Sequence, residues 1–263
     1  MLRTTSVFVA FATMTLTMLP NIVLAQESDD DQPFRSSTDQ RSSEILHECI
    51  VAMGGMALDD AVNLVAKGNH LITIRDSNSD TDSIHESTLT VSGLRYHDAL
   101  VSGHFTNDRF SNGTSTWYFH NGKPSSFNAV ASKPADLIPW PSCVLSWQDR
   151  NQIVYVGEAT IEEQKFWKLK FTQADGHQSF RFFNQTTSLP ERVEYSLDEK
   201  ENPGAVATFE FSQKNRIQLP LEIRDTIQLD EGKKRINFHV FQEVEFDPEI
   251  DEEVFEIPAE FRD

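Results

Sequence analysis

Residues 166–197, FWKLKFTQADGHQSFRFFNQTTSLPERVEYSL, decide the fold class of this chain. Trp167, Leu169 and Phe171 alternate with residues that include two lysines, and this period of two places one set of side chains on each face of a β-strand. The pair Asp175-Gly176 is typical of a hairpin turn, and the polar turn at 184–188 leads into another alternating run. The stretch therefore predicts three consecutive antiparallel strands.

The hairpin also predicts which aromatic side chains lie together. A tight turn at Asp175-Gly176 folds Ser179 to Phe183 back onto the preceding strand, so we expect Phe180 and Phe182 to share its buried face. The third strand contributes Val193, Tyr195 and Leu197 to the same face. The stretch contains no combination of nucleophile, base and metal ligands, so it favours a binding scaffold over a catalytic one.

The first residues indicate where the protein works. Arg3 precedes an apolar run from Val7 to Leu19, and Val23-Leu24-Ala25 provides the site at which a signal peptidase would cut. The run contains threonines and is shorter than the roughly 18 to 20 apolar residues that a membrane-spanning helix requires. Residues 1–25 are therefore predicted to be a signal peptide, and the mature chain a periplasmic or extracellular protein without a transmembrane segment.

The composition is strongly acidic. The 263 residues include 23 Lys and Arg and 41 Asp and Glu, which give a formal net charge of −18. Removal of residues 1–25 takes away Arg3 and no acidic residue, which leaves 22 minus 41, or −19. Such a charge disfavours nucleic acid and anionic membranes, and it favours solubility or a basic protein partner. The mature length is compatible with a single all-β domain.

Two cysteines, Cys49 and Cys143, occur in the whole chain. In an oxidising compartment an even pair invites a disulfide, which would stabilise the fold by roughly 4 to 5 kcal/mol because it closes a long loop. The alternative is a pair of buried thiols that behave as small apolar side chains. Their spacing does not indicate a zinc site.

Two helices are predicted before the first strand. Residues 26–41 are polar and acidic and are expected to form a flexible leader, so the domain covers 42–263. Ser42 or Ser43 is a suitable N-cap for a helix that ends at Gly54-Gly55. A second helix is expected over Ala57 to Lys67, with Gly68 as its terminator.

From Leu71 onward, alternating runs and turn residues predict a meander that brings the total to about ten strands. Asn121-Gly122 is a second hairpin signal, which would place Trp117 and Phe119 opposite Phe127. The segment 132–147 contains three prolines and two tryptophans and cannot be a central strand. It is predicted to be a lid-like connection or a short helix.

Three motifs are similar to those of the LolA/LolB-like periplasmic lipoprotein-carrier superfamily. They are IVAMGGMALDDAVNLVAKG at 50–68, FRFFNQTTSLPERVEY at 180–195, and the pair IQLPLEI at 217–223 with EVFEIPAEF at 253–261. The resemblance spans Ser42 to Phe261. It implies a strongly curved antiparallel sheet, an unclosed half-barrel capped by N-terminal helices, whose concave apolar face holds acyl chains or another hydrophobic ligand.

That resemblance directs attention to the apolar side chains that keep phase along successive strands. The expected binding wall comprises Trp167, Leu169, Phe171, Phe180, Phe182, Tyr195, Phe209 and Phe211, and the same phase continues through Leu219, Leu221, Ile236, Phe238 and Val240. Phe166, Phe183 and Phe241 fall on the opposite phase and are expected to be exposed, or covered by the leader or a partner. The expected lid comprises Ile45, Ile50, Met53 and Trp140. The same stripe would serve equally as filled core beneath two helices.

The sequence motifs give little support to an enzymatic function. The eight histidines show no H-E-x-x-H or other close metal spacing, and no G-x-S-x-G motif occurs. We therefore predict no catalytic residue, metal or cofactor. The predicted function is non-covalent binding of a hydrophobic or amphiphilic ligand, with lipid or lipoprotein transfer as the context. The alternative is an interaction or sensor module with a packed concave face that meets a basic partner.

Overall fold

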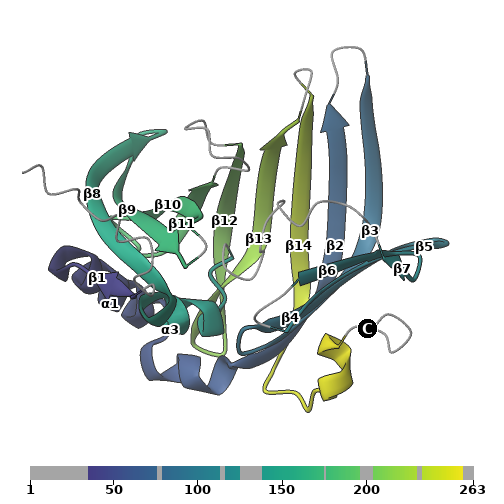
Figure 1. Ribbon diagram of the computed structural model, residues 1–263, viewed down its shortest axis with the longest axis horizontal. Helices are drawn as coiled ribbons and strands as arrows, with labels where there is room; N and C mark the ends of the chain where they lie inside the picture. The colour runs from purple at the N-terminus through teal and green to yellow at the C-terminus, as the bar shows by residue number, and fades with distance from the viewer. Residues whose placement is uncertain are drawn as a thin grey trace, which may run out of the picture. The chain divides into compact units, whose positions relative to one another are not determined.

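One large sheet dominates the computed structural model (Figure 1). The structure describes residues 35–75, 79–112, 116–124, 138–174, 176–195, 204–229 and 233–256. They all belong to one unit, Phe34–Asp263. The predicted signal peptide, Leu197, Phe127 and the closing Pro258 lie outside the described residues, as does the leader before Arg35.

The sheet contains fourteen strands among the described residues, where the sequence indicated about ten. Helices α1 and α3 and the 3-10 helices η1 and η3 complete the fold. In chain order the elements are β1 (Ser37–Thr38), α1 (Gln40–Met53), η1 (Gly55–Ala61), β2 (Asn63–Arg75), β3 (Asp80–Ser92), β4 (Arg95–Ser102), β5 (Phe105–Ser111), β6 (Thr116–His120), β7 (Lys123–Pro124), α3 (Pro141–Arg150), β8 (Asn151–Ile161), β9 (Gln164–Gln173), β10 (Gln178–Asn184), β11 (Pro190–Tyr195), β12 (Ala205–Lys214), β13 (Ile217–Gln228), β14 (Lys234–Phe246) and η3 (Glu252–Phe255).

The strand order is β1-β8-β9-β10-β11-β12-β13-β14-β2-β3-β4-β5-β6-β7. Consecutive strands pair antiparallel through two meanders, β8 to β14 and β2 to β7, and the pairing of β14 with β2 joins the meanders. The two-residue edge strand β1 pairs parallel with β8. Because β1 and β7 lie at opposite edges and do not pair, the predicted unclosed, strongly curved sheet is confirmed.

Helix α1 begins one turn before the predicted N-caps. Asp39 caps it instead of Ser42 or Ser43: its Oδ1 accepts a hydrogen bond from the Ser42 backbone N–H at 3.0 Å, and its Oδ2 accepts one from the Ser42 hydroxyl at 2.7 Å. The same Oδ2 accepts the Tyr155 backbone N–H at 2.7 Å. This carboxylate therefore ties the start of α1 to strand β8.

The prediction of a second helix from Ala57 to Lys67 was wrong beyond Ala61. The 3-10 helix η1 ends there, and strand β2 begins at Asn63. The apolar run Leu64, Val65, Ala66 fits a strand as well as a helix, and pairing with β14 on one side and β3 on the other decides for the strand.

Gly68 lies within β2 and does not terminate a helix. A Cβ atom at this position would lie 1.9 Å from the Val240 carbonyl oxygen, beside the bulge between Phe241 and Glu243 of β14. Glycine is required here because the neighbouring backbone approaches too closely for any side chain.

The hairpin turn predicted at Asn121-Gly122 is confirmed. Asn121 and Gly122 have φ angles of 49° and 70° and connect β6 to β7, as expected for a hairpin turn with two positive φ values. The Pro-Trp segment ends as a short helix, α3, with Pro141 at its first turn.

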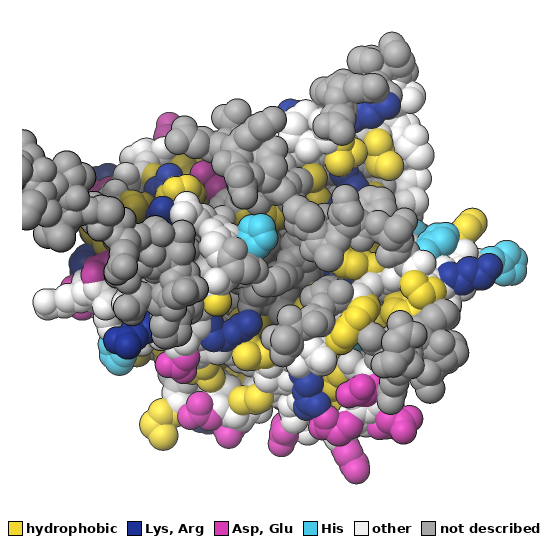
Figure 2. All heavy atoms as spheres, viewed as in Figure 1, with side chains coloured by type: hydrophobic (Ala, Val, Ile, Leu, Met, Phe, Trp, Pro, Cys, Tyr) yellow, Lys and Arg dark blue, Asp and Glu magenta, His cyan; other side chains and the backbone are white. Residues whose placement is uncertain are grey.

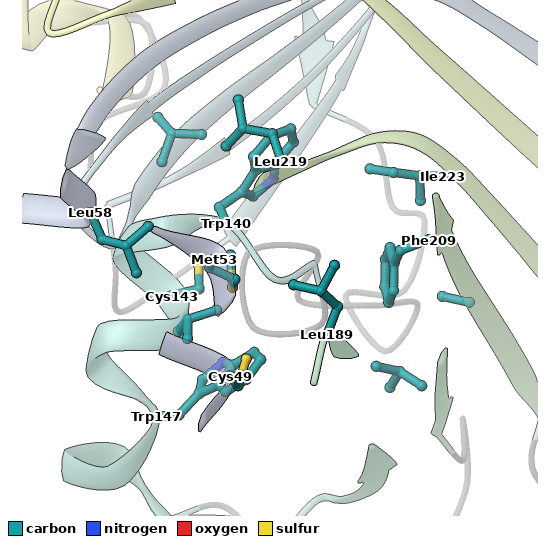
Figure 3. Close-up of a cluster of buried hydrophobic side chains, with 14 of the residues drawn as sticks. Cys49, Met53, Leu58, Trp140, Cys143, Trp147, Leu189, Phe209, Leu219 and Ile223 are labelled. Carbon is teal, nitrogen blue, oxygen red and sulfur yellow. The ribbon is translucent and has the colours of Figure 1, made fainter. Parts of the chain in front are cut away.

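Helices α1 and α3 pack against each other and against strand β8, and α1 also contacts β13 (Figure 1). Their buried side chains join those of the sheet in one apolar cluster, which includes Ile45, Met53, Trp140, Cys143, Trp147, Phe171, Phe209, Leu219 and Ile223. Figure 3 shows Cys49 and Met53 of α1 together with Cys143 and Trp147 of α3 in this cluster. We call the sheet face that carries the cluster the inner face.

Candidate functional site

The β9–β10 register reverses part of the expected binding wall. A two-residue turn at Asp175-Gly176 would pair residue 174 with 177, but Gln173 N–H donates to the His177 carbonyl at 2.9 Å, so the loop has three residues. Arg181 therefore lies opposite Leu169, and Phe182 opposite Lys168. A shift of one residue moves every side chain of a strand to the other face.

The assignment of Phe180 and Phe182 to the inner face was accordingly wrong. Both lie on the outer face, where Phe182 contacts Phe166 edge-on at a centroid distance of 6.4 Å. The Lys168 ammonium lies 4.2 Å from the centre of the Phe180 ring and 5.2 Å from that of Phe182. These rings are covered by basic side chains, which explains how they are tolerated outside the core.

Phe183 and Phe241 were expected to be exposed, or covered by the leader or a partner, but both belong to the inner cluster. On β14 the register places Asn237, His239 and Phe241 on the inner face, since they lie opposite Asp225, Ile223 or Gly68 of the neighbouring strands. The expected inward phase of Ile236, Phe238 and Val240 was therefore wrong as well. Apolarity favoured the other set, but the pairing of β14 with β13 and with β2 decides the phase.

Beneath α1 and α3, aromatic side chains of helix and sheet pack against each other on the inner face. The Trp147 ring meets Phe171 and Phe183 edge-on at centroid distances of 5.5 and 6.2 Å. The fully buried Arg181 guanidinium lies 4.3 Å from the Trp147 ring centre and 4.1 Å from that of Phe171. These side chains belong to the buried core, which includes an arginine that the sequence did not single out.

The other six residues of the expected binding wall lie in the inner cluster or pack against it. Leu169, Phe171, Tyr195 and Phe209 are buried in the cluster, while Trp167 and Phe211 pack at its margin. Trp167 is covered by α1, because the Arg41 guanidinium lies 4.6 Å above its ring. Ligand contact by these residues stays a prediction.

The expected lid residues Ile45, Met53 and Trp140 are buried against the sheet, and Ile50 is partly buried at the edge of the same cluster. Cys49 and Cys143 are both buried and are not joined by a disulfide in the structure, which agrees with the alternative of two buried thiols. Burial raises the pKa of the Cys49 thiol far above its ordinary value. Cys49 is therefore not an activated nucleophile, because it is buried and its pKa is raised.

A narrow pocket opens beside the filled region, between the N-terminal end of α3 and strands β3, β4, β5, β13 and β14. A water-sized sphere can occupy only about 40 Å³ of it, and its empty volume reaches about 460 Å³ only when its mouth, open to solvent, is included. The lining consists of Leu89, Val91, Tyr96, Asp98, Arg109, Ile138, Trp140, Cys143, Ile223, His239 and Phe241. Most of these side chains are apolar, and Trp140 meets Phe241 edge-on at a centroid distance of 5.7 Å.

Three titratable side chains give the pocket a polar end. Asp98 and Arg109 are cross-strand neighbours on β4 and β5, and the Asp98 Oδ2 lies 3.8 Å from the Arg109 Nη2. Burial disfavours the charge of Arg109, but the facing Asp98 carboxylate leaves the pKa of Arg109 raised. His239 of β14 completes this end.

Beside the pocket, His70 of β2 stacks on His239, with ring centroids 3.7 Å apart and planes inclined by 15°. Burial lowers the pKa of His70 to about 2, assisted by His239. Burial, with the nearby Arg109 charge, lowers the pKa of His239 to about 3. Both rings are therefore neutral at physiological pH.

Further polar side chains continue along the inner face from this pair. Tyr195 donates its hydroxyl proton to Asp225 Oδ1 at 3.0 Å, and the Asn237 side-chain amide donates to Asp225 Oδ2 at 3.3 Å. Burial raises the pKa of Asp225, although these two hydrogen bonds act in the opposite direction. Tyr195, expected in an apolar wall, therefore belongs to a polar belt across the concave face.

The described residues contain no group of three or more His, Cys, Asp or Glu side chains that could hold a metal ion. Nor does any helix in the described part of the chain have the length and apolarity needed to cross a membrane.

The sequence singled out residues on the α3 side of the pocket but not those on its sheet side. Trp140 was singled out as a lid residue and Cys143 as a disulfide candidate, whereas none of the eight expected wall residues lines the pocket. An available signal was the alternation of Leu89 and Val91 with polar residues on β3. The pairing of Asp98 with Arg109 depends on the β4–β5 register and has no counterpart in local sequence.

No protein-family model matches the sequence, and no curated protein matches it significantly. Several solved structures, however, are similar to this chain in three dimensions. A LolA superfamily protein from Nitrosomonas europaea has a TM-score of 0.57 at 10% identity, with 81% of this chain and 96% of the other covered. A DUF1329 family protein from Desulfovibrio piger has a TM-score of 0.55 at 13% identity over the same shares.

A domain from Vibrio parahaemolyticus, assigned as an outer membrane lipoprotein-sorting protein, has a TM-score of 0.54 at 12% identity. The match covers 81% of this chain and 94% of that domain. At these identities the likeness concerns the fold. The chain therefore has a LolA/LolB-like fold, as its motifs predicted.

Proposed function

We propose that this protein binds a hydrophobic or amphiphilic ligand non-covalently in the pocket beside α3, and that it acts outside the cytoplasm in lipid or lipoprotein transfer. The observation that carries the proposal is the mainly apolar pocket on the concave face of a LolA/LolB-like sheet. A concave, mostly apolar site with a few polar groups is the usual form of a small-molecule site.

The arrangement of α3 supports entry by displacement of a lid. Trp140 and Cys143 form the helix side of the pocket, and Ile223 and Phe241 form part of the sheet side. Movement of the N-terminal end of α3 away from the sheet would widen the pocket without breaking any strand pairing. Each acyl CH₂ then buried would contribute about 0.8 kcal/mol to binding.

The first test is native mass spectrometry of gently purified protein, together with titration of N-phenyl-1-naphthylamine, an uncharged probe that fluoresces in apolar surroundings. We expect co-purifying lipid and saturable probe binding. Ile138→Asp places a charge in the pocket lining at a partly exposed position and should weaken probe binding by about tenfold or more.

Val154→Asp is the control, because Val154 is 49% exposed on β8 and does not line the pocket. It should bind the probe like the wild type. A ligand-free protein that gives no saturable probe signal would rule the proposal out.

A second function, binding of a basic protein partner, is favoured by one observation. The exposed acidic side chains Asp247, Glu249, Asp251, Glu252 and Glu253 gather around η3, where Figure 2 shows a group of acidic side chains. The close packing of Trp147, Phe171 and Phe183 beneath α1 and α3 is compatible with such a module. Salt-dependent binding of a basic polypeptide by a protein that binds no probe would select this alternative.

A further inference from the structure

The polar end of the pocket carries hydrogen-bonding capacity that the described chain does not use. Asp98 is 6% exposed, and its Oδ1 has no hydrogen-bond partner among the described residues. The Arg109 Nε and the His239 Nδ1 are likewise buried without one. Unsatisfied buried polar atoms are costly and rare, so a cluster of three at the wall of one pocket points to a ligand that satisfies them.

The charges at this end restrict the ligand. The Asp98 Oδ2 and Arg109 Nη2 are 3.8 Å apart, so the two side chains offset each other's charge without a direct hydrogen bond between these atoms. A carboxylate ligand that approached Arg109 would be repelled by Asp98, and an ammonium that approached Asp98 would be repelled by Arg109. Neutral His239 alters neither balance.

We infer that the pocket takes an amphiphile whose head group is uncharged and carries both a donor and an acceptor, as an amide or a hydroxyl does. This inference rests on the proposed function and narrows its ligand class. The head group donates to the Asp98 carboxylate and accepts from the Arg109 guanidinium, both of which line the pocket, while the chain lies along Leu89, Val91 and Phe241 toward Trp140. An amide fits best because its N–H and C=O are separate groups.

Four ten-carbon ligands that differ in the head group test the inference: decanamide, decanol, decanoate and methyl decanoate. Each is used below its aggregation limit at pH 7.5 to displace N-phenyl-1-naphthylamine from the full-length mature protein. Decanamide and decanol should bind about tenfold more tightly than decanoate, and also more tightly than the ester, which accepts but cannot donate. Equal or tighter binding of decanoate or the ester would overturn the inference.

The Asp98→Asn variant sharpens the test. It retains the side-chain shape but removes the charge that repels decanoate, so the preference for decanamide over decanoate should fall about tenfold or more. The control is Asp108→Asn, which removes a carboxylate from the opposite face of the same β4–β5 pair, where Asp108 contacts His97 at 3.0 Å. It should leave the preference unchanged.

The outcomes separate the two proposals. If all four ligands bind equally, the proposed function stands and the head-group inference fails. If none binds and the probe does not bind either, both fail. If Asp98→Asn does not fold, the wild-type series decides alone, because the ester and decanoate lack the required donor at pH 7.5.

Discussion

The imidazole rings of His70 and His239 stack across the β2–β14 strand pair, with their centroids 3.7 Å apart. No side chain in the described part of the chain donates to or accepts from either nitrogen of His70, although that residue is only 3% exposed. His85, Asp98 and Arg109 also face the pair and affect the His70 pKa. The stack is thus neutral, buried and close to the pocket.

This stack predicts a dependence of stability on pH. The pKa of His70 is lowered from 6.5 to about 2, so between these values the unfolded chain binds a proton that the folded chain does not. The free energy of unfolding should fall as the pH drops below about 6.5, by on the order of 1 kcal/mol per pH unit from His70.

Urea unfolding at several pH values from 7.5 to 4.5 measures the effect. His70→Phe keeps a ring on His239 but cannot titrate, so its profile should be flatter than that of the wild type. His47→Phe changes an exposed histidine on α1 and should run parallel to the wild type. Parallel wild-type and His70→Phe profiles would contradict the prediction.

The position of Arg181 between Trp147 and Phe171 predicts a structural role for its guanidinium. Arg181→Met retains much of the side-chain volume but loses two cation–π contacts at 4.3 and 4.1 Å, each worth about 1 to 2 kcal/mol in a desolvated setting. The desolvation cost of the charge is lost with it, so the net destabilisation should be about 1 to 3 kcal/mol.

Urea unfolding followed by tryptophan fluorescence measures this loss. The matched control is Arg192→Met on the outer face, where the guanidinium lies 5.8 Å from the Phe182 ring centre and pairs with Glu194. It should cost less than 1 kcal/mol. If the two variants lost equal free energy of unfolding, the predicted structural role of the Arg181 guanidinium would be contradicted.

The β9–β10 register predicts opposite behaviour for two phenylalanines on the same strand. Phe183 is fully buried in the inner cluster, so Phe183→Ala should cost about 3 to 5 kcal/mol. Phe180 is only partly buried beneath Lys168, and Phe180→Ala should cost about 1 kcal/mol. Paired urea denaturation curves make the comparison, and the reverse order would favour the two-residue turn.

The close approach of β14 to Gly68 predicts that this position accepts no side chain. Gly68→Ala would bring a Cβ to 1.9 Å from the Val240 carbonyl oxygen, so the β2–β14 backbone must shift, at a cost of about 3 kcal/mol or more. Asn69→Ala, at the exposed neighbouring position, should change stability by less than about 0.5 kcal/mol. Thermal unfolding of both variants tests this, and a wild-type melting temperature for Gly68→Ala would refute the constraint.

Much of the fold could be predicted because its signals are local. The alternation in Trp167, Leu169 and Phe171 reports a strand without reference to the rest of the chain, and Asn121-Gly122 reports a hairpin turn for the same reason. The prediction was wrong where one stretch of sequence is compatible with both a helix and a strand. Residues 63–67 satisfy a helix and a strand equally, and only their pairing with β3 and β14 separates the two.

The binding wall was harder to predict because sheet faces depend on register. One additional loop residue before β10 exchanged Phe180 and Phe182 for Arg181 and Phe183, and the pairing of β14 placed His239 inside instead of Phe238. Apolarity is a weak guide on such strands, since lysine and arginine stems can cover an outward aromatic ring.

The sequence by itself determined a mainly β, antiparallel, LolA/LolB-like architecture with helices against its concave side, since strand period, turn residues and motif order are carried by neighbouring residues. Only the tertiary structure decided which side chains of that concave side pack beneath the helices and which line the pocket beside α3. Asp98, Arg109 and His239 come from three strands of two meanders, and their meeting at one end of the pocket depends on cross-strand register and on the pairing of β14 with β2. These long-range relationships have no local signature.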